Sequence, residues 1–240
     1  MLWYKPLDII KYQDQLKDGD IFIYHRVGNW FNAFGAKLIQ WGSGGPFNHT
    51  DFVYKDSTGK LRVIFADLKN GVCDREWEKT YGKLNVYIMV LRPTIMQDGR
   101  KYNADKDGKG VIEIAKKYIG LKYDWMALSV FFFKAMGLGI FNKWNPFHLR
   151  NRYFCSENVV KVEREYGVDI CPSYNESSVS INQLFLDPEN QLEFIVLEPE
   201  MKAKKNTELK KELLSKKSIL NYEQREILMD KLKEEIIKDV

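Results

Sequence analysis

The stretch HTDFVYKDSTGKLRVIFADL, residues 49–68, decides how the chain is interpreted. Two runs rich in β-branched and aromatic residues flank KDSTGK, which has the composition of a turn, so a β-hairpin is predicted. The natural register pairs Tyr54 with Arg62, and continuing it places His49 opposite Asp67. Directly opposed side chains share a face, with Cβ atoms about 4.5–5.5 Å apart. The hairpin therefore predicts an imidazole held by a carboxylate.

Three features of the hairpin leave open which carboxylate is the partner of His49. Asp51 follows His49 by two positions, so it shares the same face and competes as partner of the ring. A slip of one residue would place His49 and Asp67 on opposite faces. Asp67 is also suited to cap a turn with Asn70 and Gly71.

Outward from the hairpin, apolar periodicity and turn residues predict the remaining elements. Strands are expected at residues 21–27, 84–93 and 192–199, and helices at residues 7–18, 29–41, 110–120 and 157–167. Residues 42–48 and 94–107 are expected to be loops. Strands and helices are segregated along the chain, which favours an α+β fold with an antiparallel sheet over a doubly wound parallel one.

The composition is that of a folded protein with a substantial core. The chain has 240 residues, of which 45% are hydrophobic and 14% aromatic, and this excludes wholesale disorder. The 37 basic and 33 acidic side chains nearly balance, so nucleic acid is not expected as a partner. We predict one domain over residues 1–200 and a charged helical extension over residues 201–240. The extension is expected to dock on the body or on a protein partner, or to be a solvated appendage.

Two segments bear on where in the cell the protein is expected. The apolar stretch 125–141 is interrupted by Lys134 and is short for a membrane span, so a buried or surface-lying helix is expected. The first residues carry scattered charges and no apolar run, which predicts no secretory signal and a cytoplasmic, reducing location. The Lys-, Ile- and Asn-rich composition fits a bacterial or phage source.

The cysteines and histidines do not suggest a metal site. Cys73, Cys155 and Cys171 are odd in number and widely spaced, so neither a disulfide framework nor a cysteine zinc site is expected. His25 and His148 are interpreted as surface or loop residues. No metal and no cofactor is predicted.

One cysteine stands where a nucleophile would be activated. In RYFCSENVV, residues 152–160, Cys155 opens a predicted helix, where the unpaired amides and the helix dipole favour a thiolate. The same amides are suited to bind an oxyanion. Ser156 is a second candidate contact to the oxyanion or substrate, although Ser156 and Glu157 also suit a helix start. Without a base nearby, Cys155 would be a buried structural thiol.

The order of these segments resembles the circularly permuted papain-like cysteine hydrolases of the NlpC type, in particular the YiiX-like group. The resemblance covers roughly residues 16–170 and is carried by five segments: LKDGDIFIY (16–24), FNHTDFVY (47–54), VIFADLKNGV (63–72), IGLKYDW (119–125) and YFCSENVV (153–160). Two departures are Asp51 after the histidine and an aspartate, not the commoner glutamate, at position 67.

The resemblance implies a permuted papain-like fold in which the sheet packs on the nucleophile helix. It also implies a Cys155–His49–Asp67 triad, with Tyr123 assisting the oxyanion unless it only packs in the core. The expected activity is hydrolysis of an amide or isopeptide bond, as in a cell-wall peptide. Lipid acyl hydrolysis or transfer, with residues 125–141 in contact with a membrane, is one alternative. A non-catalytic structural role in an assembly is the other.

Overall fold

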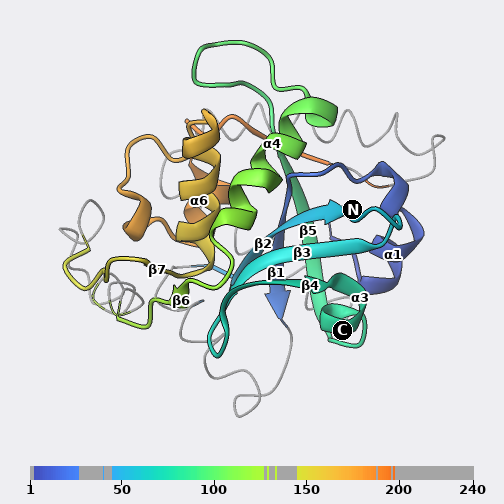
Figure 1. The fold of residues 1–240 in the computed structure, drawn as a ribbon, viewed down its shortest axis with the longest axis horizontal. Helices are drawn as coiled ribbons and strands as arrows, with labels where there is room; N and C mark the ends of the chain where they lie inside the picture. The colour runs from blue at the N-terminus through green and yellow to red at the C-terminus, as the bar shows by residue number, and fades with distance from the viewer. Residues whose placement is uncertain are drawn as a thin grey trace.

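The sheet of the protein is antiparallel and carries helices on both faces (Figure 1). The computed structural model describes residues 3–26, 40, 45–126, 129, 133, 145–187, 189–195 and 197. Six strands lie in the order β4-β3-β2-β1-β5-β8. Their bounds are β1 (Asp20–Arg26), β2 (His49–Lys55), β3 (Leu61–Asp67), β4 (Gly71–Glu76), β5 (Val86–Pro93) and β8 (Leu192–Phe194). The α+β prediction is confirmed at this level.

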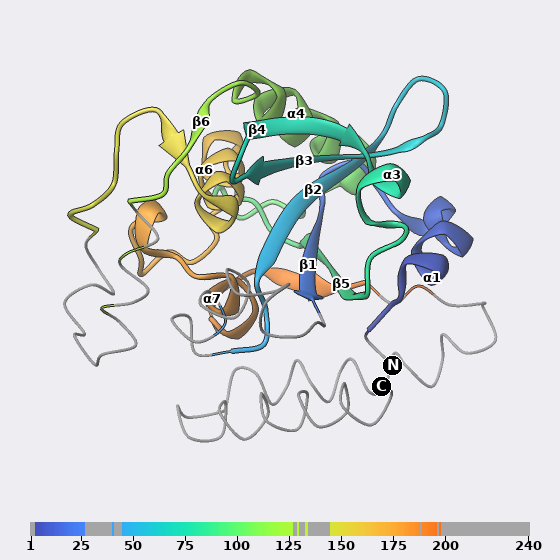
Figure 2. The ribbon, with the colours of Figure 1, turned by 90° about the horizontal axis from the view of Figure 1, so that it is seen from below.

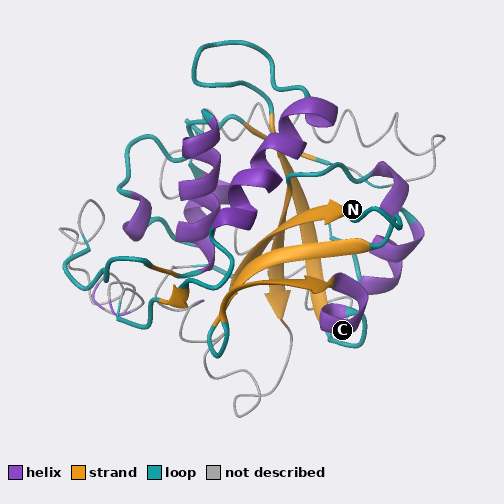
Figure 3. Ribbon diagram, in the orientation of Figure 1, coloured by secondary structure: helices purple, strands orange, loops and turns teal. Residues whose placement is uncertain are grey.

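The helices divide between the two faces of the sheet. On one face lie α4 (Ala104–Lys117), α6 (Cys155–Tyr166) and α7 (Ile181–Leu186), and on the other lie α1 (Pro6–Lys11) and α3 (Trp77–Tyr81). Figure 1 shows α4 and α6 side by side, away from α1 and α3, and Figure 3 shows these helices in purple beside the orange strands of the sheet. A short parallel pair, β6 (Lys122–Tyr123) and β7 (Arg152–Tyr153), lies beside the start of α6.

Two separate cores result from the alternation of side chains along the central strands. We call the core beneath α4 and α6 the first core; it contains Ile23, Phe52 and Val160. The core beneath α1 and α3 is the second core; it contains Tyr24 and Val53, the chain neighbours of two first-core residues. Successive residues of a strand point to opposite faces, so each central strand is buried on both sides.

The helix that carries Cys155 has well-defined ends. Phe154 is the extended N-cap residue, and its amide donates to Glu157 Oε2 at 3.4 Å, so α6 begins at Cys155. The helix ends at Gly167, whose φ of 98° is left-handed, a conformation that glycine adopts at helix ends at low cost. The local sequence therefore places the sulfur in the first turn.

The hairpin forms with the predicted register, but its ladder is shorter than the extrapolation required. Tyr54 pairs with Arg62, as predicted, and the pairing extends to Phe52 and Ile64. Beyond that point His49 pairs with a residue of β1, and Asp67 pairs with Gly71 of β4. Figure 2 shows β2 and β3 separating toward these ends. The prediction that His49 stands opposite Asp67 is therefore wrong, because each strand follows its other neighbour there.

Several element boundaries also differ from the prediction. The helix expected over residues 7–18 is α1 followed by a 3₁₀ turn at Gln13–Gln15, and α4 begins inside the expected loop 94–107. The last strand ends at Phe194. Elements β4, α3, β6, β7 and α7 were not predicted, because most are too short to show a period. The helix expected over residues 29–41, most of residues 125–141 and the extension 201–240 lie outside the described residues.

No helix within the described residues combines the length and the hydropathy needed to cross a membrane.

Candidate active site

Cys155 and His49 come together although they are far apart along the chain. Cys155 is the first residue of α6 and is only 2% exposed. Helix α6 packs on β2 and β3, and His49 opens β2. The Cys155 thiol lies close enough to the His49 imidazole to help raise the pKa of the ring. The predicted nucleophile and the predicted base are thus neighbours.

The carboxylate on the ring is Asp51. His49 Nε2 lies 2.6 Å from Asp51 Oδ1, and the Asp51 side chain is completely buried while that of His49 is 23% exposed. The two residues are two positions apart on one strand, so they share a face. Because Nε2 is bound to Asp51, Nδ1 is the ring nitrogen left for the sulfur.

The electrostatics of this group favour a charged ring. Burial by itself lowers the pKa of His49, but the negative charge and hydrogen bond of Asp51 outweigh it, Cys155 adds to the rise, and the pKa reaches about 10. The imidazole is therefore protonated at neutral pH. An imidazolium beside a thiol stabilises the thiolate, which is the attacking form.

Aromatic side chains of the second core pack against the His49 ring. The His49 ring contacts Tyr24 and Phe65, each at a centroid distance of 5.7 Å, and Tyr81 at 6.3 Å. The pKa values of Tyr24 and Tyr81 are raised, first by burial and then by the charge of the nearby Asp51. Both phenols therefore stay protonated.

Neither of these two tyrosines was identified as a site residue from the sequence. Tyr24 ends the strand segment LKDGDIFIY, and Tyr81 lies on α3, an element without a sequence period. Tyr24 Oη also accepts from Trp77 Nε1 at 3.2 Å. The signal for Tyr24 was available in principle, because β1 is the neighbour of the histidine strand; nothing local indicated Tyr81.

Asp67 has other partners. Its carboxylate accepts from the Asn70 side chain and, at 3.3 Å, from Arg75 Nη2, as a turn-capping residue would. Phe65, two residues earlier on β3, packs on the His49 ring. The predicted orienting role of Asp67 is therefore corrected: Asp51, first named as its competitor, occupies that position.

Tyr123 lies next to the nucleophile, as the resemblance implies. It is 5% exposed, and its pKa is raised well above the usual value, first by burial and then by the charge of Cys155. The chain before it is held against β4, where Val72 N donates to Leu121 O at 2.8 Å. Gly71 permits this approach, since its φ is 73° and a Cβ there would collide with Leu121 O. Tyr123 is thus a protonated donor close to the sulfur.

Ser156 anchors the helix instead of facing a substrate with its hydroxyl. Its Oγ donates to Val179 O at 2.7 Å, and the residue is 1% exposed. The predicted contact of this side chain with an oxyanion is corrected accordingly, because the hydroxyl proton is already used. The amides of the first turn, which have no partner within a helix, are the better donors.

A second polar cluster borders the same helix turn. Asp124 directly follows Tyr123, Glu157 lies two residues after Cys155, and His148 Nδ1 is 3.2 Å from Asp124 Oδ2 and 3.1 Å from Glu157 Oε1. Glu157 has the helix-start role expected of it and an additional contact with His148. No sequence spacing indicated this cluster, because its three members come from different segments.

Neither protein-family models nor curated protein sequences match this chain.

Proposed function

We propose that the protein is a cysteine hydrolase of amide or isopeptide bonds, with Cys155 as nucleophile, His49 as base and Asp51 as the residue that orients the ring. The observation that carries the proposal is a buried thiol close to an imidazole whose Nε2 lies 2.6 Å from Asp51 Oδ1. Nucleophile, base and orienting group in series are the arrangement that nucleophilic catalysis requires. The order of the segments, which resembles the permuted papain-like hydrolases, supports the same class and the corresponding fold.

Acylation follows from this arrangement. The Cys155 thiolate, paired with the protonated His49 ring, attacks the carbonyl carbon and forms the C–S bond while the carbonyl π electrons move to oxygen. Amides of the first turn of α6 and the Tyr123 hydroxyl stabilise the oxyanion. When the tetrahedral intermediate collapses, the C–N bond breaks and the imidazolium gives its proton to the leaving amine.

Deacylation uses the same groups in reverse order. Water attacks the thioester carbonyl while His49 accepts a water proton. The C–S bond then breaks and releases a carboxylic acid and the thiolate beside an imidazolium. Asp51 keeps one ring nitrogen occupied in both half-reactions, so the other nitrogen always faces the reacting atoms.

Apolar exposure beside the site favours a second candidate, hydrolysis or transfer of a lipid acyl group by the same residues. Trp125 and Met126 are 55% and 49% exposed directly after Tyr123, and the Trp125 ring lies 5.6 Å from the Tyr123 ring. Leu149 is 40% exposed, and its amide binds Asp124. A long acyl chain would find apolar surface here. Comparing hydrolysis of acyl esters of increasing chain length with hydrolysis of peptide amides separates the two substrates.

Covalent labelling tests the proposal without a known substrate. The full chain is treated at pH 7 with a peptide-based electrophile, and the modified residue is located by mass spectrometry. We expect one adduct, on Cys155, that is absent in Cys155→Ser and forms at least about 100-fold more slowly in His49→Ala, since a positioned base contributes about 10²–10⁴-fold.

Cys73 supplies the matched control. Burial raises its pKa to about 11, with smaller effects from neighbouring charges, so at pH 7 it is an unreactive thiol. Cys73→Ser should label like the parent chain. An adduct that persists in Cys155→Ser, or an unchanged rate in His49→Ala, would contradict the proposal.

A further inference from the structure

Three side chains converge beside the first turn of α6 from separate segments. Asp124 follows β6, His148 lies in the stretch between residues 145 and 151, and Glu157 lies on α6. His148 Nδ1 is 3.2 Å from Asp124 Oδ2 and 3.1 Å from Glu157 Oε1, and the three atoms all lie within 4.8 Å of one another. None of the three takes part in the proposed hydrolysis.

The burial of the two acids makes the cluster unusual. Asp124 is 0% exposed and Glu157 2%, whereas the His148 side chain is 34% exposed. Positive charge close by stabilises carboxylates that are removed from water. A divalent cation would compensate both acids.

Backbone amides hold both acids in place. Leu149 N donates to Asp124 Oδ2 at 2.7 Å, and Phe154 N donates to Glu157 Oε2 at 3.4 Å. The second interaction leaves Oε1, the other oxygen of Glu157, directed at His148. Supporting hydrogen bonds of this kind orient metal ligands before the ion arrives.

We propose that Asp124, His148 and Glu157 form a Zn²⁺ site adjacent to the candidate catalytic cysteine. Bonds of about 2.0 Å to a tetrahedral ion place neighbouring ligand atoms about 3.3 Å apart, close to the two short separations in the cluster. One imidazole and two carboxylates are ligands that Zn²⁺ accepts, whereas Ca²⁺ takes six to eight oxygens. Water reaches the cluster from the exposed side of His148 and completes the coordination.

Binding would displace the proton from His148 Nδ1, because a metal ligand must be deprotonated. The ion would join three chain segments: the residue after Tyr123, the stretch that carries His148, and the helix turn that carries Cys155. It would thereby stabilise the placement of the nucleophile without touching the substrate.

The test uses the full chain with Cys155→Ala, so that Zn²⁺ on the catalytic thiol is not counted. After chelator treatment and dialysis, Zn²⁺ is titrated by calorimetry, with Ca²⁺ as comparison. We expect one Zn²⁺ per chain and at least about 100-fold weaker binding after His148→Gln, more than the loss of a supporting residue costs. His25→Gln, a matched change at a histidine outside the cluster, should bind normally.

Thermal unfolding provides a second, independent readout of binding. Zn²⁺ should raise the Tm of the Cys155→Ala chain and Ca²⁺ should not, and the rise should disappear in Asp124→Asn. The proposal is overturned if Zn²⁺ does not bind, if His148→Gln binds as tightly as the parent, or if His25→Gln loses affinity equally.

Discussion

At the scale of single residues, Asp51 determines the charge of the site. It is completely buried on β2, and its neighbours are the His49 ring and the hydroxyls of Tyr24 and Tyr81. Aromatic residues of the second core are therefore part of the surroundings of the Asp51–His49 pair.

The first prediction concerns the His49 ring. Asp51→Asn removes the charge that outweighs the effect of burial, so the pKa of His49 should fall from about 10 to near or below its ordinary value of 6.5. The imidazolium is then lost at neutral pH, and Cys155 should alkylate at least about tenfold more slowly at pH 7. NMR titration of the histidine rings and the alkylation rate measure both effects.

The control for this prediction is Asp67→Asn, the same change at the other carboxylate. Asp67 binds Asn70 and Arg75, so the titration of His49 should hardly move. A larger shift from Asp67→Asn than from Asp51→Asn would show that the ring has the other partner.

A second prediction concerns Glu163, a completely buried residue whose two carboxylate oxygens have no hydrogen-bond partner within the described residues. Burial, followed by the charge of Asp20, raises its pKa. A raised pKa means that stability is greatest below the unfolded pKa of about 4.3 and is lost as pH rises toward the folded pKa.

Glu163→Gln removes this dependence. Relative to the parent, the variant should gain stability as the pH rises above the unfolded pKa of about 4.3, by at most about 1.4 kcal/mol per pH unit. Urea unfolding at several pH values measures the difference. A difference that does not change with pH would refute the assignment.

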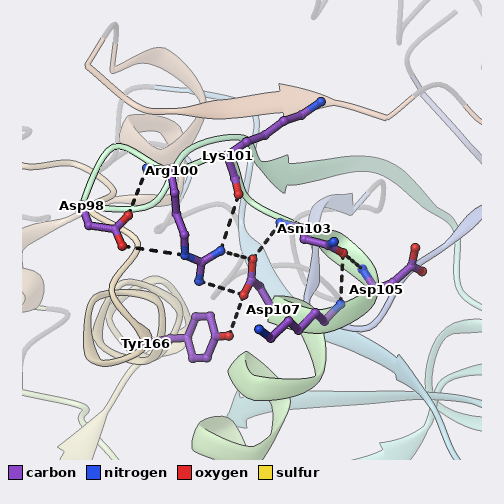
Figure 4. A network of polar contacts seen from close by, with 8 residues as sticks. Asp98, Arg100, Lys101, Asn103, Asp105, Asp107 and Tyr166 are labelled. Atoms are coloured by element: carbon purple, nitrogen blue, oxygen red, sulfur yellow. Dashed lines mark hydrogen bonds and ion pairs between the residues drawn. The ribbon is translucent and has the colours of Figure 1, made fainter.

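At the scale of elements, one buried carboxylate joins α4 to its neighbours. Asp107 accepts from Arg100 Nη1 at 2.7 Å and Nη2 at 2.9 Å, from Asn103 N at 2.7 Å and from Tyr166 Oη at 2.8 Å. Figure 4 shows these groups converging on Asp107 from the preceding loop and from α6. The Arg100 guanidinium, against the effect of burial, holds the pKa of Asp107 well below its usual range. The network thus ties α4 to the helix of the nucleophile.

The third prediction follows from this network. Asp107→Asn should lower the free energy of unfolding by about 1.5–3 kcal/mol, the contribution of hydrogen bonds to a charged group. Because the folded pKa is depressed, the cost should be full above about pH 4 and vanish as pH falls further. Denaturant unfolding at pH 7 and pH 3 measures it.

Asp105→Asn is the matched control on the same helix turn. Asp105 pairs with Lys17 at 2.7 Å, but its side chain is 75% exposed. Its loss should cost less than about 0.5 kcal/mol, as expected of a surface ion pair. Equal effects of the two substitutions would mean that the network adds nothing beyond helix capping.

At the scale of the whole molecule, the site lies where the two cores meet. Cys155 belongs to the first core, whereas His49 packs on Tyr24, Phe65 and Tyr81 of the second core. The ladder between β2 and β3 ends at Phe52 and Ile64, short of His49. A cavity in the first core should therefore affect the reactivity of Cys155 differently from a cavity in the second core.

The fourth prediction compares one valine from each core. Val160 on α6 and Val90 on β5 are both 0% exposed, and either change to Ala should cost about 2 kcal/mol in lost burial and cavity formation. Val160→Ala should also slow the alkylation of Cys155, because the helix that carries the sulfur loses its packing. Val90→Ala should leave that rate unchanged. Slower alkylation in both variants would mean that reactivity follows global stability.

Local sequence determined the parts of the site that depend on neighbours along the chain. The alternating strands around KDSTGK predicted the register of Tyr54 with Arg62, which the structure confirms. The pattern ending in Gly167 predicted the helix at Cys155, because capping residues and apolar spacing act within a few turns. The face shared by His49 and Asp51 also follows from strand geometry alone.

Only the tertiary structure decided which carboxylate holds the ring and which groups surround it. The ladder of β2 and β3 ends at Phe52 and Ile64, since β2 continues along β1 and β3 along β4, and so Asp67 is not carried to His49. Likewise, Tyr81 and His148 reach their partners from elements distant in sequence. Local propensity sets each strand and turn, but the packing of the whole sheet sets where two strands part, and that point lies at the site.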